Sequence, residues 1–328
     1  QIATAIGGFF PFIMATMVYT ETITPIALLV LTLLGGSTRA FNVPARNAMV
    51  HALVDKKDIS AVIAVNGASY HSGNFIGPAI AGVVLFYGSV AIALYAYAAV
   101  SFGVVILYKF LDIEDGGTEK KDRKSIGAEL AEGFRYAYNH TGIRNLMIMT
   151  AIVTLFLQPY MEMLPAFATE IFGRKVEGYA MLATSAGLGA MFGGLWLAQR
   201  GRTEGLMRIL LVSTLIGVLS VIAFSQTSNF YLAMAEMFLS GIALVSSGIC
   251  TLSLIQNSVD ANVRGRVISF NGILVTGGPA LGAIIIGTVA ERYGVQNPVM
   301  VSALLGLVIW LIMVRPNMKQ AARLEIAD

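Results

Sequence analysis

The stretch from Leu206 to Ser225 reads LMRILLVSTLIGVLSVIAFS, a predominantly apolar run of about 20 residues. An α-helix rises about 1.5 Å per residue, so a helix of this length crosses a hydrocarbon core about 30 Å thick. Comparable runs follow one another along the chain, separated by short polar segments. The sequence predicts ten membrane-spanning helices, over Ile2 to Tyr19, Thr24 to Met49, Ser60 to Tyr87, Val90 to Leu111, Arg144 to Ile171, Gly178 to Gln199, Leu206 to Ser225, Phe230 to Ile255, Arg266 to Ala290 and Pro298 to Val314.

The composition agrees with a chain whose surface largely faces lipid. Hydrophobic residues make up 56% of the chain and charged residues 12%, and the mean hydropathy is +0.73. A water-soluble domain carries about 25% charged residues, which cover its surface. A water-soluble fold is therefore excluded, and we predict an all-α integral membrane protein.

The composition also argues against several kinds of site. Cys250 is the single cysteine, so it has no disulfide partner, and no metal-ligand spacing surrounds it. The three histidines, His51, His71 and His140, stand apart, unlike the clustered acid, base or ligand groups of membrane-embedded enzymes. The net charge of +3 is too small and too scattered for a nucleic-acid surface. We expect no cofactor, no metal ion and no nucleic-acid partner, and we predict that the protein is not an enzyme.

Lysine and arginine accumulate in alternate loops, as they do on the cytoplasmic side of membrane proteins. One set of alternate loops is poor in lysine and arginine and holds only Arg174, Lys175 and Arg292. We predict a multi-pass protein of the cell inner or plasma membrane, with its central linker and its C-terminus in the cytoplasm. The rich set comprises Arg46, Lys56, Lys57, the run from Lys120 to Lys124, Arg135, Arg200, Arg202, Arg264, Arg266, Arg315, Lys319 and Arg323.

The longest polar stretch divides the predicted spans into four and six. It predicts an N-terminal helical half over residues 1–111, a cytoplasmic linker over 112–143 and a C-terminal helical half over 144–328 with a short cytoplasmic tail. Within the linker, apolar residues recur every four positions after Ser125, a good helix N-cap. This pattern predicts a helix along the membrane surface, either an ordinary solvated linker or a regulatory element.

Two stretches of the chain match each other and suggest an internal repeat. One begins at Val54 (VDKKDISAVIAVNGASYHSGNFIGPAIAG) and the other at Val259 (VDANVRGRVISFNGILVTGGPALGA). Both would run outward from the cytoplasm, which makes them parallel repeats of two six-helix halves. The first half shows four spans, so we expect that two helices before Gln1 are missing. The matched anchors are Val54-Asp55 with Val259-Asp260, Asn66-Gly67 with Asn271-Gly272, and Gly77-Pro78-Ala79 with Gly278-Pro279-Ala280.

Two parallel halves joined by a charged cytoplasmic linker resemble the major facilitator superfamily. The segment with Gly73, Gly77, Pro78, Ala81 and Gly82 is similar to the antiporter signature GxxxGPxxGG of its fifth helix, with alanine for one glycine. Small residues at this spacing let another helix approach closely, and the proline bends the helix where a gate could flex. Plain helix packing without a role in coupling is the alternative.

A second resemblance indicates one branch within this superfamily. The segment Ala40-Phe41-x-x-Pro44-Ala45-Arg46 resembles the end of helix four in the drug:proton antiporter-3 branch, which includes siderophore and macrolide exporters. The loop Arg200-Gly201-Arg202 is similar to a degenerate copy of the basic gating loop of the superfamily, but it lacks that loop's acidic residue. The resemblance implies export by alternating access, driven by the proton gradient.

Polar residues within the predicted spans are the candidates for proton or substrate contacts, because such groups are costly in lipid. Glu162 and Glu236 are the candidate carboxylates, with an interfacial or structural role as the alternative. Arg39 would pair with a carboxylate or extend to the membrane surface. His71 would titrate near neutral pH or form a structural hydrogen bond. The remaining cavity candidates are Asn66, Asn74 and Asn271.

The sequence favours proton-coupled export of a small amphiphilic compound, such as a drug, a siderophore or a lysolipid. A facilitated uptake carrier for a metabolite and a transport-dead sensor or scaffold are the alternatives. We expect as partners a small-molecule substrate, protons and membrane lipid, and we expect the protein to be a monomer.

Overall fold

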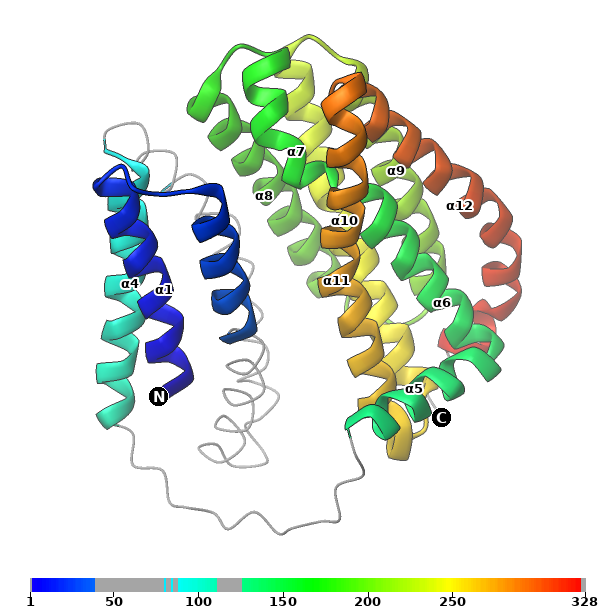
Figure 1. Ribbon diagram of the computed structural model, residues 1–328. Coiled ribbons are helices and arrows are strands. Elements are labelled where there is room, and N and C mark those ends of the chain that lie inside the picture. The colour runs from blue at the N-terminus through cyan, green and yellow to red at the C-terminus, as the bar shows by residue number, and fades with distance from the viewer. Residues whose placement is uncertain (1, 39–79, 81–83, 85–87, 111–125, 326–328) are drawn as a thin grey trace. The chain divides into compact units, whose positions relative to one another are not determined.

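A computed structural model of the chain describes residues 2–38, 80, 84, 88–110 and 126–325 (Figure 1). These residues form two compact units, one within residues 1–120 and one from residue 121 onward. The regular elements in both are helices, and seven of these helices are long and apolar enough to cross a membrane. The part of the chain that the structure describes is therefore all-α, as predicted.

The first unit contains three described helices of substantial length: α1 (Ile2–Tyr19), the short apolar helix Pro25–Thr38, and α4 (Val90–Leu107). Helix α4 is capped at its start by Ser89, whose hydroxyl accepts a hydrogen bond from the backbone N–H of Ile92. It packs against α1, where Tyr95 stacks edge-on against Phe12 and donates a hydrogen bond to Thr16 at 3.1 Å. The predicted span over Ser60 to Tyr87 lies almost wholly outside the described residues.

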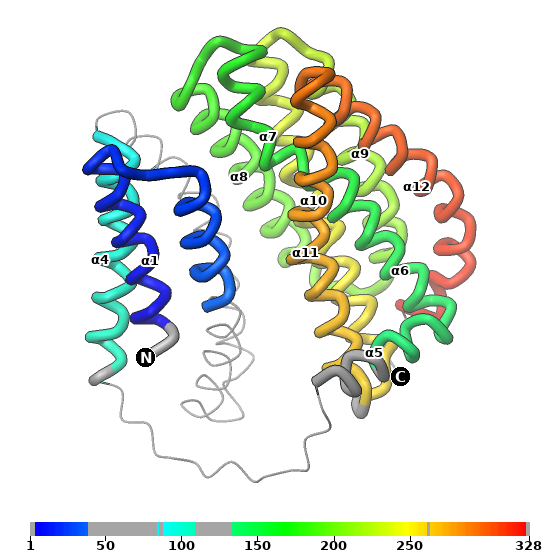
Figure 2. Tube along the Cα trace, viewed as in Figure 1, coloured from blue at the N-terminus to red at the C-terminus, as the bar shows by residue number. Residues whose placement is uncertain are grey.

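The second unit is a bundle in which consecutive helices run between two ends (Figure 2). We call the end that carries α5 (Ile126–Asn139) and residues 201–205 the linker end, and the end that carries residues 172–174 and 227–229 the distal end. The first span, Thr141–Ile171, starts at the linker end, and the others alternate. They are α8 (Lys175–Arg200), α9 (Leu206–Gln226), α10 (Phe230–Ser258), α11 (Ala261–Tyr293) and α12 (Gln296–Glu325).

Glycines let α8 and α10 approach closely near their middles. A Cβ atom added to Gly189 would overlap the carbonyl oxygen of Phe238, and one added to Gly241 would overlap the carbonyl oxygen of Ala186. At Gly193 it would lie 2.9 Å from the carbonyl oxygen of Ile242. Association of helices in lipid depends on such close packing, since burial of apolar surface adds little there.

The linker helix predicted after Ser125 is present as α5, and it packs across the start of α11 (Figure 1). A Cβ atom on Gly133 would lie 2.7 Å from the carbonyl oxygen of Arg266. Phe134 packs edge-on against Phe270, with ring centroids 5.4 Å apart. The helix thus belongs to the second unit, while its position along a membrane surface stays a prediction.

Several predicted helix ends need correction. Helix α12 continues to Glu325 instead of ending at Val314, and α11 spans Ala261–Tyr293 instead of Arg266 to Ala290. The reason is that hydropathy detects the part of a helix that lies in lipid, whereas backbone hydrogen bonds carry these helices into polar sequence. In the first unit α4 stops at Leu107, and a short 3₁₀ turn, Tyr108–Phe110, follows it.

Candidate functional site

The first span of the second unit is interrupted twice by π-helical segments. Helix α6 (Thr141–Ala151) passes into a π-helical segment at Ile152–Leu157, and α7 (Tyr160–Ala166) passes into another at Phe167–Ile171. Pro159 is the N-cap residue of α7 and Pro165 lies within this helix. Neither proline has a backbone N–H to donate to the helical hydrogen bonds. Single-turn π segments occur often at functional sites, because they change the direction in which side chains point.

Glu162 lies on α7 between these two segments, and its side chain is exposed on the surface of the unit. Its side chain forms no hydrogen bond or ion pair with the residues that the structure describes. A charge exposed to lipid at the centre of a span costs about 3 kcal/mol. The position therefore requires a polar surrounding, such as a water-filled cavity or a facing polar group.

A buried hydrogen bond joins the first span to α10 near the distal end. The hydroxyl oxygens of Tyr160 and Ser240 lie 2.7 Å apart, and both side chains are fully buried. Ser240 also lies close to the carbonyl oxygen of Met237, at 2.9 Å, so both hydroxyl groups are satisfied. Glu236 lies one helical turn before Ser240, half-buried, and its carboxylate has no bonded partner within the described ranges.

Asn271 forms a second buried polar contact, between α11 and α6. It is 8% exposed, and its side-chain oxygen accepts a hydrogen bond of 3.0 Å from the hydroxyl of Thr150. Gly278, in the same repeat stretch, lies against the first span, where an added Cβ atom would be 2.7 Å from Thr154 Cβ. Asn271 is thus engaged in helix–helix contact in this structure.

The loop Arg200-Gly201-Arg202 follows the last turn of α8. Gly201 adopts a left-handed conformation (φ 55°), which glycine tolerates and which commonly ends a helix. Arg200 donates a hydrogen bond to the carbonyl oxygen of Glu204, so it braces the loop from inside. Its Nη1 atom is buried and has no partner in the described part of the chain.

A carboxylate from the last turn of α12 caps the start of α9, directly after this loop. The Glu325 carboxylate accepts hydrogen bonds from the backbone N–H groups of Gly205, at 2.8 Å, and Met207, at 2.9 Å. A carboxylate at the first turn of α9 satisfies free N–H groups and complements the helix dipole. The sequence interpretation missed Glu325, since it placed the end of the last helix at Val314; a helix-favouring run of lysine, arginine, alanine and glutamate after Pro316 was the available signal.

Of the predicted site residues, the structure describes Glu162, Glu236, Asn271 and the loop of Arg200, Gly201 and Arg202. It gives each a position, but it does not join Glu162, Glu236 and Asn271 by any direct hydrogen bond. The other predicted site residues lie outside the described ranges. They are Arg39, Asn66, His71, Gly73, Asn74, Gly77, Pro78, Ala81 and Gly82.

Comparisons with known proteins agree on one family. Residues 9–327 match the family described as transmembrane secretion effector, of the major facilitator type. The chain is 22% identical to macrolide efflux protein A of Streptococcus pyogenes over 88% of its own length and 71% of that protein. It is 22% identical to the staphyloferrin A transporter of Staphylococcus aureus, over 95% of the chain and 78% of that protein. The solved structure of the nucleoside transporter NupG superposes with a TM-score of 0.69 at 16% identity, covering 96% and 82% of the two chains.

Proposed function

Because the chain belongs to the transmembrane secretion effector family of the major facilitator superfamily, we propose that it exports a small amphiphilic compound by proton-coupled alternating access. Membership of this family makes the chain an integral membrane transporter and confirms the prediction of a carrier over an enzyme. The predicted all-α fold of the major facilitator type is confirmed as well. Relatives named for macrolide efflux and for staphyloferrin A support a drug or a siderophore as the substrate class.

One observation supports proton coupling most directly. In the described spans, Glu162 and Glu236 are the carboxylates that lie more than one helical turn from either end of their span. Neither carboxylate is neutralised by a partner within the described ranges. In alternating access, a carboxyl group in the span faces first one side of the membrane and then the other. Such a group is well suited to bind a proton on one side and release it on the other, since its charged form is costly in lipid.

The two carboxylates have different surroundings, and we assign them different roles. Glu162 is exposed beside a π-helical segment, so it is our candidate for the proton carrier. Glu236 is half-buried one turn from the Tyr160–Ser240 hydrogen bond, so it is our candidate for contact with a polar group of the substrate. The few other charges in the spans favour a lipophilic or zwitterionic substrate over a phosphorylated one.

Efflux from energised bacterial cells tests the proposal. Cells that express the gene are loaded with ethidium or with a radiolabelled macrolide, and release is followed with and without a protonophore. We expect protonophore-sensitive efflux, at least about tenfold slower in Glu162→Gln, because the amide cannot carry a proton. Glu236→Gln should weaken apparent affinity more than maximal rate.

The matched control is Glu177→Gln, since Glu177 is an exposed carboxylate in the first turn of α8. This variant should transport like the parent. Efflux that survives both the protonophore and Glu162→Gln would contradict proton coupling. Accumulation above that of cells without the gene would instead establish uptake, and no change with any compound in any form would favour the transport-dead sensor.

We propose further that the linker end faces the cytoplasm and that the protein acts as a monomer surrounded by lipid. The described linker end carries more arginine and lysine than the distal end, which supports this orientation. Cys250 is buried, so thiol labelling starts from a low background. A membrane-impermeant maleimide should label Lys175→Cys but not Lys319→Cys in intact cells. The reverse pattern would overturn the orientation.

A further inference from the structure

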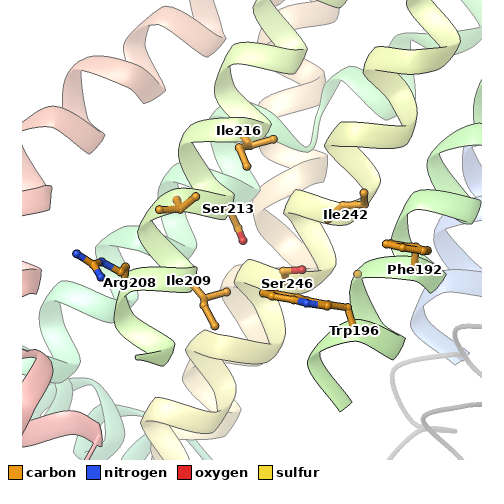
Figure 3. A pocket seen from close by; sticks show the side chains of 10 residues that line it. Phe192, Trp196, Arg208, Ile209, Ser213, Ile216, Ile242 and Ser246 are labelled. Carbon is orange, nitrogen blue, oxygen red and sulfur yellow. The ribbon is translucent and has the colours of Figure 1, made fainter. Parts of the chain in front are cut away.

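A crevice of about 410 Å³ opens between α8, α9 and α10 in the linker half of the second unit (Figure 3). Its walls are almost entirely apolar. Phe192 and Trp196 line it from α8, and both side chains are about half exposed, at 60% and 47%. Ile209, Val212 and Ile216 face them from α9. Neither the proposed transport site nor the gating loop uses these residues.

Two serine hydroxyl groups lie inside this apolar crevice without partners. Ser246, on α10, is fully buried, and its Oγ atom has no hydrogen-bond partner among the described residues. Ser213, on α9, is 8% exposed and likewise forms no hydrogen bond within the described part of the chain. Figure 3 shows both hydroxyl groups on the crevice side of their helices. An unpaired buried hydroxyl group is unfavourable, so an occupant that accepts hydrogen bonds from it would remove this cost.

A positive charge lies at the edge of the same crevice. Arg208, in the first turn of α9, is exposed and lines the crevice at its α9 edge, and its guanidinium group extends from there away from Ser213 and Ser246 (Figure 3). Its guanidinium group has no ion-pair or hydrogen-bond partner in the described ranges. From Arg208 to Ile216 the crevice follows α9 for about 12 Å, which is long enough for a large part of an acyl chain.

From this combination we propose that the crevice binds an acidic glycerophospholipid of the surrounding membrane. One acyl chain lies between the aromatic pair of α8 and the aliphatic wall of α9. An ester oxygen of the glycerol accepts hydrogen bonds from Ser213 and Ser246, and the phosphate group pairs with Arg208, whose exposed side chain turns toward the crevice when the lipid binds. A zwitterionic lipid would place its own cation beside this arginine, so the site discriminates by headgroup charge.

Native mass spectrometry of the full chain tests the site. The protein is released from nanodiscs of equal parts phosphatidylglycerol and phosphatidylcholine, and the lipids that remain bound are counted. We expect retained phosphatidylglycerol to exceed phosphatidylcholine. Arg208→Gln should lower retained phosphatidylglycerol about fivefold, the effect of one basic residue on an anionic lipid. Ser246→Ala should lower both lipids about fivefold, the effect of one hydrogen bond.

The matched control is Arg315→Gln, because Arg315 is an exposed arginine at the linker end of α12, outside the crevice. It should retain both lipids like the parent. Equal retention of the two lipids, or no difference between Arg208→Gln and Arg315→Gln, would overturn the proposal. Displacement of the lipid by free glycerol phosphate would also overturn it, since this would reveal a site for a soluble phosphate.

Discussion

The two ends of the second unit are held together in different ways. At the distal end, aromatic rings pack around Phe224, whose centroid lies 4.7 Å from that of Phe167 and 5.8 Å from that of Tyr160. At the linker end, the last turn of α12 forms hydrogen bonds with α9 and α10. Glu325 accepts from the first turn of α9, and the carbonyl oxygen of Leu324 accepts from Ser258 at 3.0 Å.

The difference concerns how easily each end can be opened. Ring packing at the distal end is spread over many contacts, each of them weak. The linker end has its own apolar core, in which Met207 and Leu324 are buried, but the hydrogen bonds of Glu325 and Ser258 beside it are few and directional. We therefore expect loss of a distal ring to reduce global stability and loss of the Glu325 hydrogen bonds to act locally.

The close contact of α8 and α10 lies between the two ends of the unit and holds the two helices together along their middles. Its loss should therefore have the largest effect on stability. Gly241→Leu would force a side chain into the carbonyl group of Ala186 and separate the two helices. We expect a loss of about 4 kcal/mol or more, seen as failure to recover folded protein. Gly248→Leu is the control, because a Cβ atom at this α10 glycine meets nothing within 4 Å. Similar yields of the two variants would contradict the close contact.

At the distal end, Phe224→Ala should lower the free energy of unfolding by about 3–5 kcal/mol, because it removes a fully buried ring and leaves a cavity. The measurement is the thermal unfolding midpoint in detergent. Phe192→Ala, which shortens a side chain that is 60% exposed, serves as the comparison and should change the midpoint much less. Equal shifts would remove the distinction between the ring cluster and the lipid-facing surface.

At the linker end, Glu325→Ala should cost only about 1–2 kcal/mol, the usual value of a helix cap. The effect should be local: faster hydrogen exchange in residues 205–209, with little change in the exchange of the distal ends of α9 and α10. Glu291→Ala, at an exposed carboxylate near the distal end of α11, provides the control. Faster exchange throughout the second unit would show that the cap supports the global fold.

The smallest expected effect is a pH dependence of the contact between α5 and the start of α11. Tyr136 donates a hydrogen bond to Asp260 at 3.4 Å, and burial is the main cause that raises the pKa of the tyrosine above 10.0. A raised folded-state pKa means that the stabilisation is present below pH 10 and is lost as pH rises through the folded pKa. Hydrogen exchange in α5 should therefore rise above pH 10 beyond its normal increase with pH, and Tyr136→Phe should abolish this excess. An unchanged excess in Tyr136→Phe would contradict the assignment.

The apolar runs predicted the helix ends closely where the helix ends together with the apolar run. Helix α9 was predicted to end at Ser225 and ends at Gln226, and α10 begins at Phe230 as predicted. Prediction failed where a helix continues into polar sequence, as α12 does after Val314, because hydropathy detects only the apolar part of a helix. The π-helical segments were not predicted either, since Pro159 and Pro165 indicate a disturbed ladder without saying where the chain inserts a wider turn.

The candidate site was predictable only as a set of residue types. Charge in an apolar run identified Glu162 and Glu236, but sequence does not show which one is exposed. The partnership of Asn271 with Thr150 joins positions far apart in the chain, and the cap from Glu325 depends on a helix that was predicted too short. The division into halves at a linker over residues 112–143 stays a prediction.

The π-helical segment at Ile152–Leu157 has a consequence for how this span can evolve. Substitutions there leave the count of residues unchanged, so Tyr160 still reaches Ser240 and Glu162 keeps its orientation. A π-helical turn holds about one residue more than an α-helical turn, so deletion of a single residue here would let the turn relax to α-helical while the residues after it keep their orientation. The same deletion elsewhere in the span would rotate all that follows by about 100° and take Tyr160 out of the core, so natural variants that differ in length should lose a residue within Ile152–Leu157.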